Sequence, residues 1–270
     1  MTFEQPKVNV PIQDVTVTAT DKNVYLKGEV TADQLKDGSE ISVGDVKLDL
    51  SKATDTDKPY GLDPWQTEYV DITVTVKDKD GNVISDKLEN LTEDTTYTVE
   101  VTVAPKTVGT STPAKGDAAT AKTGVNDPAA NIYVFKPELT FRDSTAYYGE
   151  TVPTNNDYSS NRVGTEKWMH DGTEAVPSEM LGTKPMLDIS YAPDESKLKN
   201  GKYTKQDVPV SATVKIGTEN VNEHTTFVHQ DCTGKTCTLP EGYHFWIHIQ
   251  TCTLSITTPV SYTHLTLPTT

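Results

Sequence analysis

Hydrophobic and polar residues alternate with a period of two along much of the chain. The alternation is clearest over residues 15–19, 70–77, 97–103 and 208–216, where an apolar side chain occupies every second position. This period is typical of β-strands with one buried and one exposed face. The chain is therefore predicted to be all-β, built from two antiparallel β-sandwich domains in tandem. Only residues 33–36 indicate a short helical turn.

Turn-forming residues separate the predicted strands. Asp78–Lys79–Asp80–Gly81–Asn82 follows one alternating run and precedes the next, which indicates a hairpin. Its acidic residues have calcium-like spacing, but flanking strands favour a plain turn over a helix-flanked calcium loop. At Gly44–Asp45 the apolar positions change parity, as a two-residue turn requires.

The predicted domain boundary follows a short apolar strand, Ile132–Phe135. Residues 105–128 are rich in Ala, Thr, Gly, Lys and Pro without any periodicity, and they are interpreted as a long loop inside the first domain. Lys136–Pro137 would form a stiff junction. We thus expect domains at 1–136 and 137–259, with a boundary near Asn126 as the alternative.

Tyr97 begins one of the alternating strands, after Leu91–Thr96. This stretch resembles the approach to strand F of immunoglobulin-like and fibronectin-type sandwiches, in which a tyrosine hydroxyl bonds back to the chain. The resemblance implies that role for Tyr97 and an immunoglobulin-like sandwich for residues 1–136. The alternative is an ordinary buried tyrosine.

The charge of the chain restricts its partners. Its 270 residues include 39 acidic and 24 basic side chains, a net charge of −15. Such a chain repels nucleic acid and anionic membrane surfaces. No apolar run has the length of a bilayer, so no membrane insertion is expected within this sequence. No phosphate-binding or dinucleotide-binding motif is present, and no cofactor or enzymatic activity is predicted.

Cysteine and histidine gather in the last quarter of the sequence. The residues are Cys232, Cys237 and Cys252, with His229, His244 and His248. Zinc prefers these ligands, but the spacing fits no closed zinc motif. A disulfide between Cys252 and either Cys232 or Cys237 is favoured, as is usual in exported domains. A zinc or cysteine enzyme would need His229, His248 and the cysteines to converge.

Three aromatic residues form a candidate ligand platform. Tyr147, Tyr148 and Trp168 could stack against a sugar if they lay exposed on one face. The alternative is that they pack in the core. An exposed line of all three would favour carbohydrate binding, whereas complete burial would favour a purely structural segment.

Two stretches carry a family resemblance, Ile132–Ser144 with Tyr147–Glu150 and Phe227–Cys232 with Ile247–Leu254. They resemble segments that precede pilin-like B-type domains in multidomain cell-wall-anchored surface proteins of gut Clostridia-type Gram-positive bacteria. The resemblance covers most of residues 10–258. It implies an extracellular, wall-attached parent with further domains, and host or matrix glycans or proteins as partners. The parent's signal and anchor are expected outside this sequence.

The last residues, 260–270, resemble a translated transposon-end sequencing adapter. We expect this tail to be non-native and the fragment to derive from a longer gene, so the Leu-Pro-Thr-Thr end is not taken as an anchor signal.

The predicted function is that of a non-catalytic structural or adhesive stalk segment of a cell-surface protein. The alternative is an accessory carbohydrate-binding region of a secreted glycan-degrading enzyme.

Overall fold

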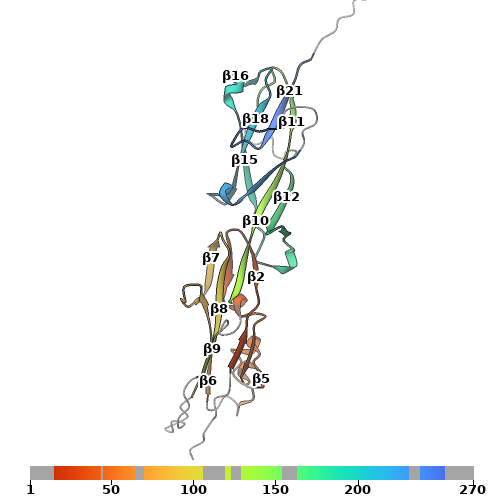
Figure 1. Ribbon diagram of the computed structural model, residues 1–270. Helices are drawn as coiled ribbons and strands as arrows, with labels where there is room; N and C mark the ends of the chain where they lie inside the picture. Colours follow the sequence, from red (N-terminus) through yellow and green to blue (C-terminus); the bar gives the residue numbers. More distant parts are fainter. Residues whose placement is uncertain are drawn as a thin grey trace, which may run out of the picture. The chain divides into compact units, whose positions relative to one another are not determined.

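The computed structural model describes residues 15–43, 45–64, 70–105, 119–122, 129–153, 163–230 and 238–252 (Figure 1). Strands dominate these residues, and α1 (Ala32–Lys36) is the one α-helix among them. The prediction of an all-β chain is therefore confirmed. Within the described ranges, no helix is long and apolar enough to cross a membrane.

The chain divides into two compact units, neither of which is continuous in sequence. Unit 1 comprises Met1–Leu139, Thr165–Asp188 and Val214–Phe227, and unit 2 comprises Thr140–Gly164, Ile189–Thr213 and Val228–Thr270. The first segment of unit 1 ends close to the predicted boundary after Lys136. Two later segments of unit 1, however, fall inside the range 137–259 that was predicted to form the second domain.

The longest ladder of unit 1 joins β6 (Val70–Asp78) and β8 (Thr95–Pro105). These antiparallel strands pair over nine positions, from Val70 opposite Pro105 to Asp78 opposite Tyr97. The apolar members of the alternation, including Val76, Val99 and Val101, are buried. β9 (Ala119–Lys122) pairs with the other side of β8. The period-two pattern thus arises because one face of each strand covers the core.

Parallel pairs distinguish the sheets from the expected antiparallel sandwich. β2 (Lys22–Tyr25) lies between β10 (Ala130–Arg142) and β14 (Met180–Leu181), and it is parallel to both. The predicted antiparallel arrangement holds for pairs such as β6 with β8 but not for these parallel pairs, because strand direction depends on pairing between distant segments and leaves no local pattern. β12 (Val163–His170) and β13 (Thr173–Glu174) extend the sheet beyond β10.

Several short elements of unit 1 follow the sequence signals closely. β1 (Val15–Thr18) pairs with β4 (Glu40–Val43), which turns into β5 (Val46–Lys47), with Val43 opposite Val46. The turn after β6 closes through Asp78, whose amide donates to the Asn82 carbonyl. β3 (Gly28–Thr31) pairs with β7 (Lys87–Leu91). Both predicted hairpins are confirmed.

The helix α1 begins with a capping box. The Thr31 hydroxyl accepts a hydrogen bond from the Gln34 amide at 3.2 Å, and the Gln34 side chain accepts from the Thr31 amide at 2.9 Å. This reciprocal pair satisfies two amides that would otherwise lack partners. It explains why a helix of five residues forms here.

β10 runs through the predicted junction without a break. Lys136 and Pro137 lie inside this strand of thirteen residues, so the expectation of a stiff linker at these residues was wrong. The strand's first ten residues belong to unit 1 and its last three to unit 2.

Unit 2 is organised around β11 (Ser144–Tyr147), β21 (Phe245–Gln250), β18 (Val208–Ile216) and β15 (Leu187–Pro193), in that sheet order. β11 is parallel to β21, and β21 is antiparallel to β18. The ring of Phe141 stacks on Phe245 at a centroid distance of 5.7 Å, and Tyr191 contacts Phe245 edge-on at 5.8 Å. These rings form the centre of the unit's core.

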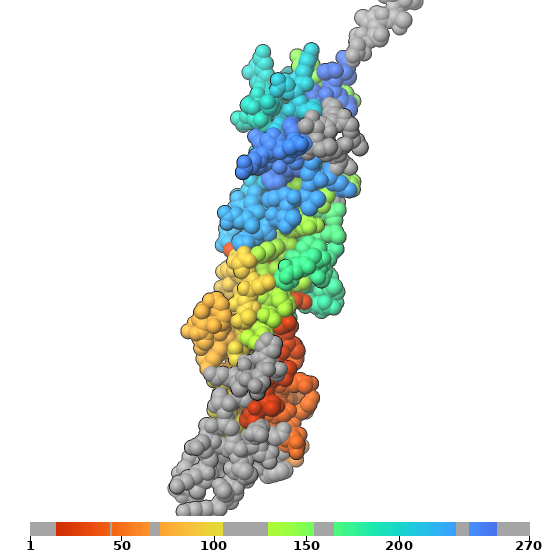
Figure 2. All heavy atoms as spheres, in the orientation of Figure 1, coloured from red at the N-terminus to blue at the C-terminus, as the bar shows by residue number. Residues whose placement is uncertain are grey.

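A small hairpin closes one end of unit 2. β16 (Leu198–Lys199) pairs with β17 (Lys202–Tyr203), and the Gly149 amide donates to the Tyr203 carbonyl at 3.0 Å. This hairpin lies on the surface, where it is visible as teal atoms in Figure 2. β19 (Glu219–Asn220) turns back on β18 as the sequence predicted, and β20 (Thr226–Gln230) follows it.

Candidate functional site

Unit 2 contains a half-buried polar cluster centred on Asp143, which lies between β10 and β11. Its Oδ1 accepts a hydrogen bond from the Trp246 amide at 2.8 Å and lies 2.7 Å from His229 Nε2. Its Oδ2 lies 3.2 Å from His248 Nε2. The Asp143 side chain is only 8% exposed. One carboxylate thus joins β20 and β21 to the start of β11.

His248 links this carboxylate to a second one. Its Nδ1 lies 2.9 Å from Asp207 Oδ2, and the other oxygen of Asp207 accepts from the Ile249 amide at 2.7 Å. Asp207 immediately precedes β18. A polar network that is partly removed from water is stabilising only when its members are satisfied by partners, as these two carboxylates are.

The sequence singled out His229 and His248 but not their partners. The structure brings the two histidines together on Asp143. Among the described residues, no group of three or more His, Cys, Asp or Glu side chains is arranged to hold a metal ion. The chemistry that the geometry supports here is the fastening of strands through charge-assisted hydrogen bonds.

Of the three cysteines, Cys252 lies within the described residues. Cys252 is exposed and carries a free thiol in the structure, so the expected bond to Cys232 or Cys237 is not formed in it. Cys232 and Cys237 lie outside the described residues. The disulfide itself stays a prediction, testable by a change of mass on reduction.

His244 has a different role from the other two histidines. Its Nδ1 accepts a hydrogen bond from the Ala212 amide at 2.8 Å. Burial lowers the pKa of this imidazole below its ordinary value of 6.5. The ring is therefore held in the neutral form that can accept, and it ties β18 to the residue before β21.

Tyr97 is fully buried, and its hydroxyl donates to the Thr20 carbonyl at 2.6 Å. Burial raises the pKa of this phenol, and the carboxylate of Asp21 raises it further. The hydroxyl does bond back to the chain, as the resemblance implied. The acceptor, however, lies 77 residues away in sequence instead of at a local corner.

The three predicted platform residues separate into two groups. Trp168 is 3% exposed and contacts Tyr25 edge-on at 5.1 Å within the core of unit 1. Tyr147 and Tyr148 are 54% and 58% exposed, and both belong to unit 2. Trp168 is therefore a core residue, and a single platform of all three does not form.

A second polar cluster, in unit 1, was not anticipated from the sequence. Glu93 accepts from Lys136 Nζ at 2.6 Å, which lowers the pKa of its carboxyl group. The neighbouring Asp94 lies 2.8 Å from His170 Nε2 and accepts from the Val134 amide. These residues border a shallow pocket of about 350 Å³.

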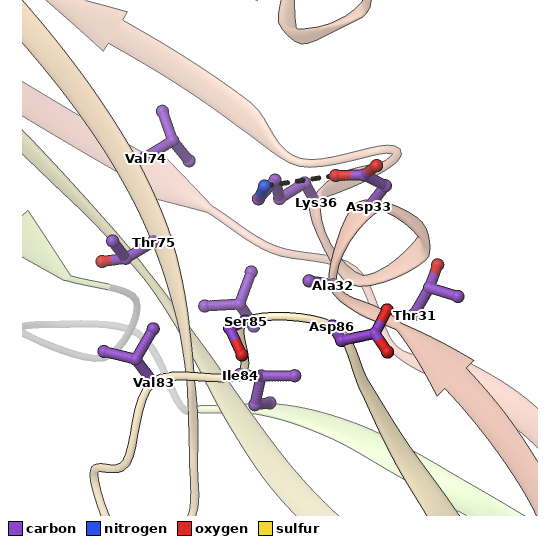
Figure 3. A pocket seen from close by; sticks show the side chains of 11 residues that line it. Thr31, Ala32, Asp33, Lys36, Val74, Thr75, Val83, Ile84, Ser85 and Asp86 are labelled. Carbon is purple, nitrogen blue, oxygen red and sulfur yellow. Dashed lines mark hydrogen bonds and ion pairs between the residues drawn. The ribbon is translucent and has the colours of Figure 1, made fainter.

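A pocket of about 380 Å³ lies beside α1 in unit 1 (Figure 3). On the side of the pocket formed by α1, Lys36 Nζ donates to Asp33 Oδ1 at 3.2 Å. Ser85 and Asp86 line the pocket from the segment after the β6 hairpin. Val74 forms part of its apolar lining. Its lining of hydroxyl, carboxylate, ammonium and apolar groups can form hydrogen bonds to a ligand and pack against it.

No protein-family model matches the chain, and no curated protein matches it in sequence.

Proposed function

We propose that the chain is a non-catalytic, tension-bearing and adhesive segment of a bacterial cell-surface protein. The observation that carries this proposal is the parallel pairing, in unit 2, of a strand near the start of the chain's path with the last described strand, together with a second parallel pair within the first segment of unit 1. In unit 1, β2 pairs in parallel with β10 over four positions, from Lys22 opposite Ile132 to Tyr25 opposite Phe135. In unit 2, β11 pairs in parallel with β21, from Ser144 opposite Ile247 to Tyr147 opposite Gln250.

Parallel pairing determines how such bonds respond to tension. When a chain is pulled from both ends, the force acts on the N-terminal end of the first strand and on the C-terminal end of the last strand. In a parallel pair these are opposite ends, so all the hydrogen bonds of the ladder are loaded together, in shear. A ladder pulled from a single end would open one bond at a time. The arrangement therefore suits a segment that transmits force.

The exposed tyrosines support the adhesive part of the proposal. Tyr147 and Tyr148 present large ring surfaces to solvent, and tyrosine is enriched at recognition surfaces. They also fit the alternative function, a carbohydrate-binding region of a glycan-degrading enzyme. The burial of Trp168 favours the structural segment over that alternative.

Single-molecule force spectroscopy tests the proposal through the direction of pulling. Cys232, Cys237 and Cys252 are replaced by serine, and new cysteines provide the handles. Arg142→Cys with Gln250→Cys loads the β11–β21 ladder in shear. Tyr147→Cys with Gln250→Cys pulls two residues that face each other across the same ladder, so the strands peel apart.

We expect unit 2 to rupture at a clearly higher force in the first pulling geometry than in the second. Both variants contain the same ladder and the same core, so any difference reports the direction of loading. Equal rupture forces would remove the mechanical argument. Forced unfolding is governed by the unfolding rate, so equilibrium stability alone cannot substitute for this measurement.

A further inference from the structure

Two exposed tyrosines and three lysines occupy one end of unit 2. We define the basic–aromatic patch as Tyr147, Tyr148, Lys199, Lys202 and Lys205, all exposed. Lys205 Nζ lies 5.7 Å from the centre of the Tyr148 ring, which is a cation–π contact. Thr151 is paired with Lys202, and Lys202 in turn is opposite Lys199. The lysines therefore adjoin the segment that carries the tyrosines.

The lysines of the patch are available for a ligand. In the described part of the chain, Lys199, Lys202 and Lys205 form no ion pair. Other lysines of the chain form ion pairs with carboxylates, for example Lys47 with Glu40 and Lys58 with Asp63. Residues 197–205 contain four lysines and no acidic residue, in a chain whose net charge is −15. The carboxylate of Glu150 lies beside Tyr147, but the four lysines outnumber it, and an excess of positive charge favours an anionic ligand.

The backbone beneath the tyrosines is already ordered. The Tyr147 amide donates to Glu150 Oε2 at 2.9 Å, and the Tyr148 amide donates to the Gln250 carbonyl at 3.0 Å. The Gly149 amide is bonded to Tyr203. Ligand binding would therefore not have to order this turn, and rigid aromatic presentation lowers the entropic cost of recognition.

We infer that the basic–aromatic patch binds an acidic polysaccharide, with the tyrosine rings stacking on sugar faces and the lysines pairing with carboxylate or sulfate groups. Clusters of lysine with this density are typical of sites for sulfated glycans. Aromatic rings supply the contact with the apolar face of a sugar. The inference rests on the adhesive part of the proposed function and names its ligand class.

The test measures binding of the full chain to immobilised heparin, which is sulfated, and to polygalacturonate, which is carboxylated, with neutral dextran as the reference surface. We expect binding to at least one acidic polymer, weakened by salt, and none to dextran. The polymer that is bound identifies the anionic group. Absence of binding to both acidic polymers would overturn the inference.

Variants locate the binding on the patch. We expect about tenfold weaker binding in the triple variant Lys199→Gln, Lys202→Gln, Lys205→Gln. Each exposed charge pair with the polymer contributes little, but the variant removes three of them at once. The matched control, Lys47→Gln with Lys52→Gln and Lys58→Gln, removes the same charge from unit 1 and should change affinity less than about twofold. Equal losses in both triple variants would contradict a localised site.

Two further outcomes decide the ligand class. Tyr147→Ala with Tyr148→Ala should weaken polysaccharide binding while leaving its salt dependence in place; unchanged affinity would exclude sugar stacking. If single-stranded DNA competes as effectively as heparin, the patch binds polyanions in general and the assignment of a glycan ligand is wrong. The pulling experiment does not depend on these results, so failure of the ligand assignment and failure of the mechanical proposal remain distinguishable.

Discussion

At the scale of single residues, His244 couples protonation to the stability of unit 2. Its Nδ1 accepts from the Ala212 amide, and its pKa is lowered by burial. The folded state therefore binds this proton less readily than the unfolded chain does. The contribution to stability is fully present above the unfolded value of about 6.5 and is lost as the pH falls through the lower, folded pKa.

We expect His244→Asn to reduce the loss of stability between neutral and acidic pH, because an amide oxygen can accept the Ala212 hydrogen bond without titrating. Urea unfolding at several pH values measures the free energy of each protein, and an NMR titration of the ring gives the pKa of His244 directly. A ring that titrates above 6.5 in the folded protein would reverse the sign of the effect.

Residue roles differ in how far the sequence predicts them. The burial of Tyr97 follows from its place in an alternating strand, but its acceptor, the Thr20 carbonyl, lies in a distant segment. Asp143 and Asp207 sit at strand ends without any periodic signal. The sequence therefore identified the histidines of the cluster, which are rare residues, and missed the aspartates, which are common in turns.

At the scale of elements, Asp143 connects strands that are far apart in sequence. Its carboxylate accepts a hydrogen bond from the Trp246 amide of β21. It also contacts His229 of β20 and His248 of β21. We expect Asp143→Asn to destabilise unit 2 by about 3 kcal/mol, because one amide group cannot serve all three partners and each buried polar group left unsatisfied costs about 1–3 kcal/mol.

Hydrogen exchange locates this effect, since the Trp246 amide should lose protection in Asp143→Asn. The control is Asp188→Asn, which removes an exposed carboxylate and should leave the exchange of β21 unchanged. Unaltered protection of Trp246 in Asp143→Asn would mean that the ladder alone holds the strand and that the carboxylate is dispensable.

β10 shows why an element can be misjudged from its sequence. Its buried positions alternate up to Val134, and then Phe135 is buried as well, so the parity of the pattern changes within one strand. Such a change is also what two strands separated by a turn produce. Pro137 strengthened that interpretation because proline interrupts most strand interiors. The continuous strand could therefore be recognised only from its partners.

At the scale of the whole molecule, the sequence predicts the class of the fold better than its connections. Alternation and turn residues identify the strands of β6, β8, β18 and β21 because these signals are local. The pairing of β14 with β2 joins Met180 to Asn23, and no local pattern reports it. Strand direction and the discontinuity of unit 1 are likewise properties of distant contacts.

The discontinuity of unit 1 leads to a prediction about a fragment. Residues 1–139 alone lack β14, which borders β2, and Trp168, which packs against Tyr25. Removal of a buried tryptophan costs about 3–5 kcal/mol, a large share of the stability of an ordinary domain. We expect the fragment to lose its cooperative thermal transition, measured by circular dichroism, while the full chain retains one.

A point variant distinguishes the loss of core packing from the loss of the residues after 139. In the full chain, Trp168→Ala leaves β14 in place and removes the buried indole, with its contact with Tyr25 and its hydrogen bond to Glu166, so unit 1 should melt at a lower temperature but still cooperatively. If the fragment 1–139 instead melted cooperatively at the temperature of unit 1 in the full chain, residues 165–188 would contribute nothing to the core. The boundary after Lys136 would then be the true one, since an autonomous domain must contain its own core.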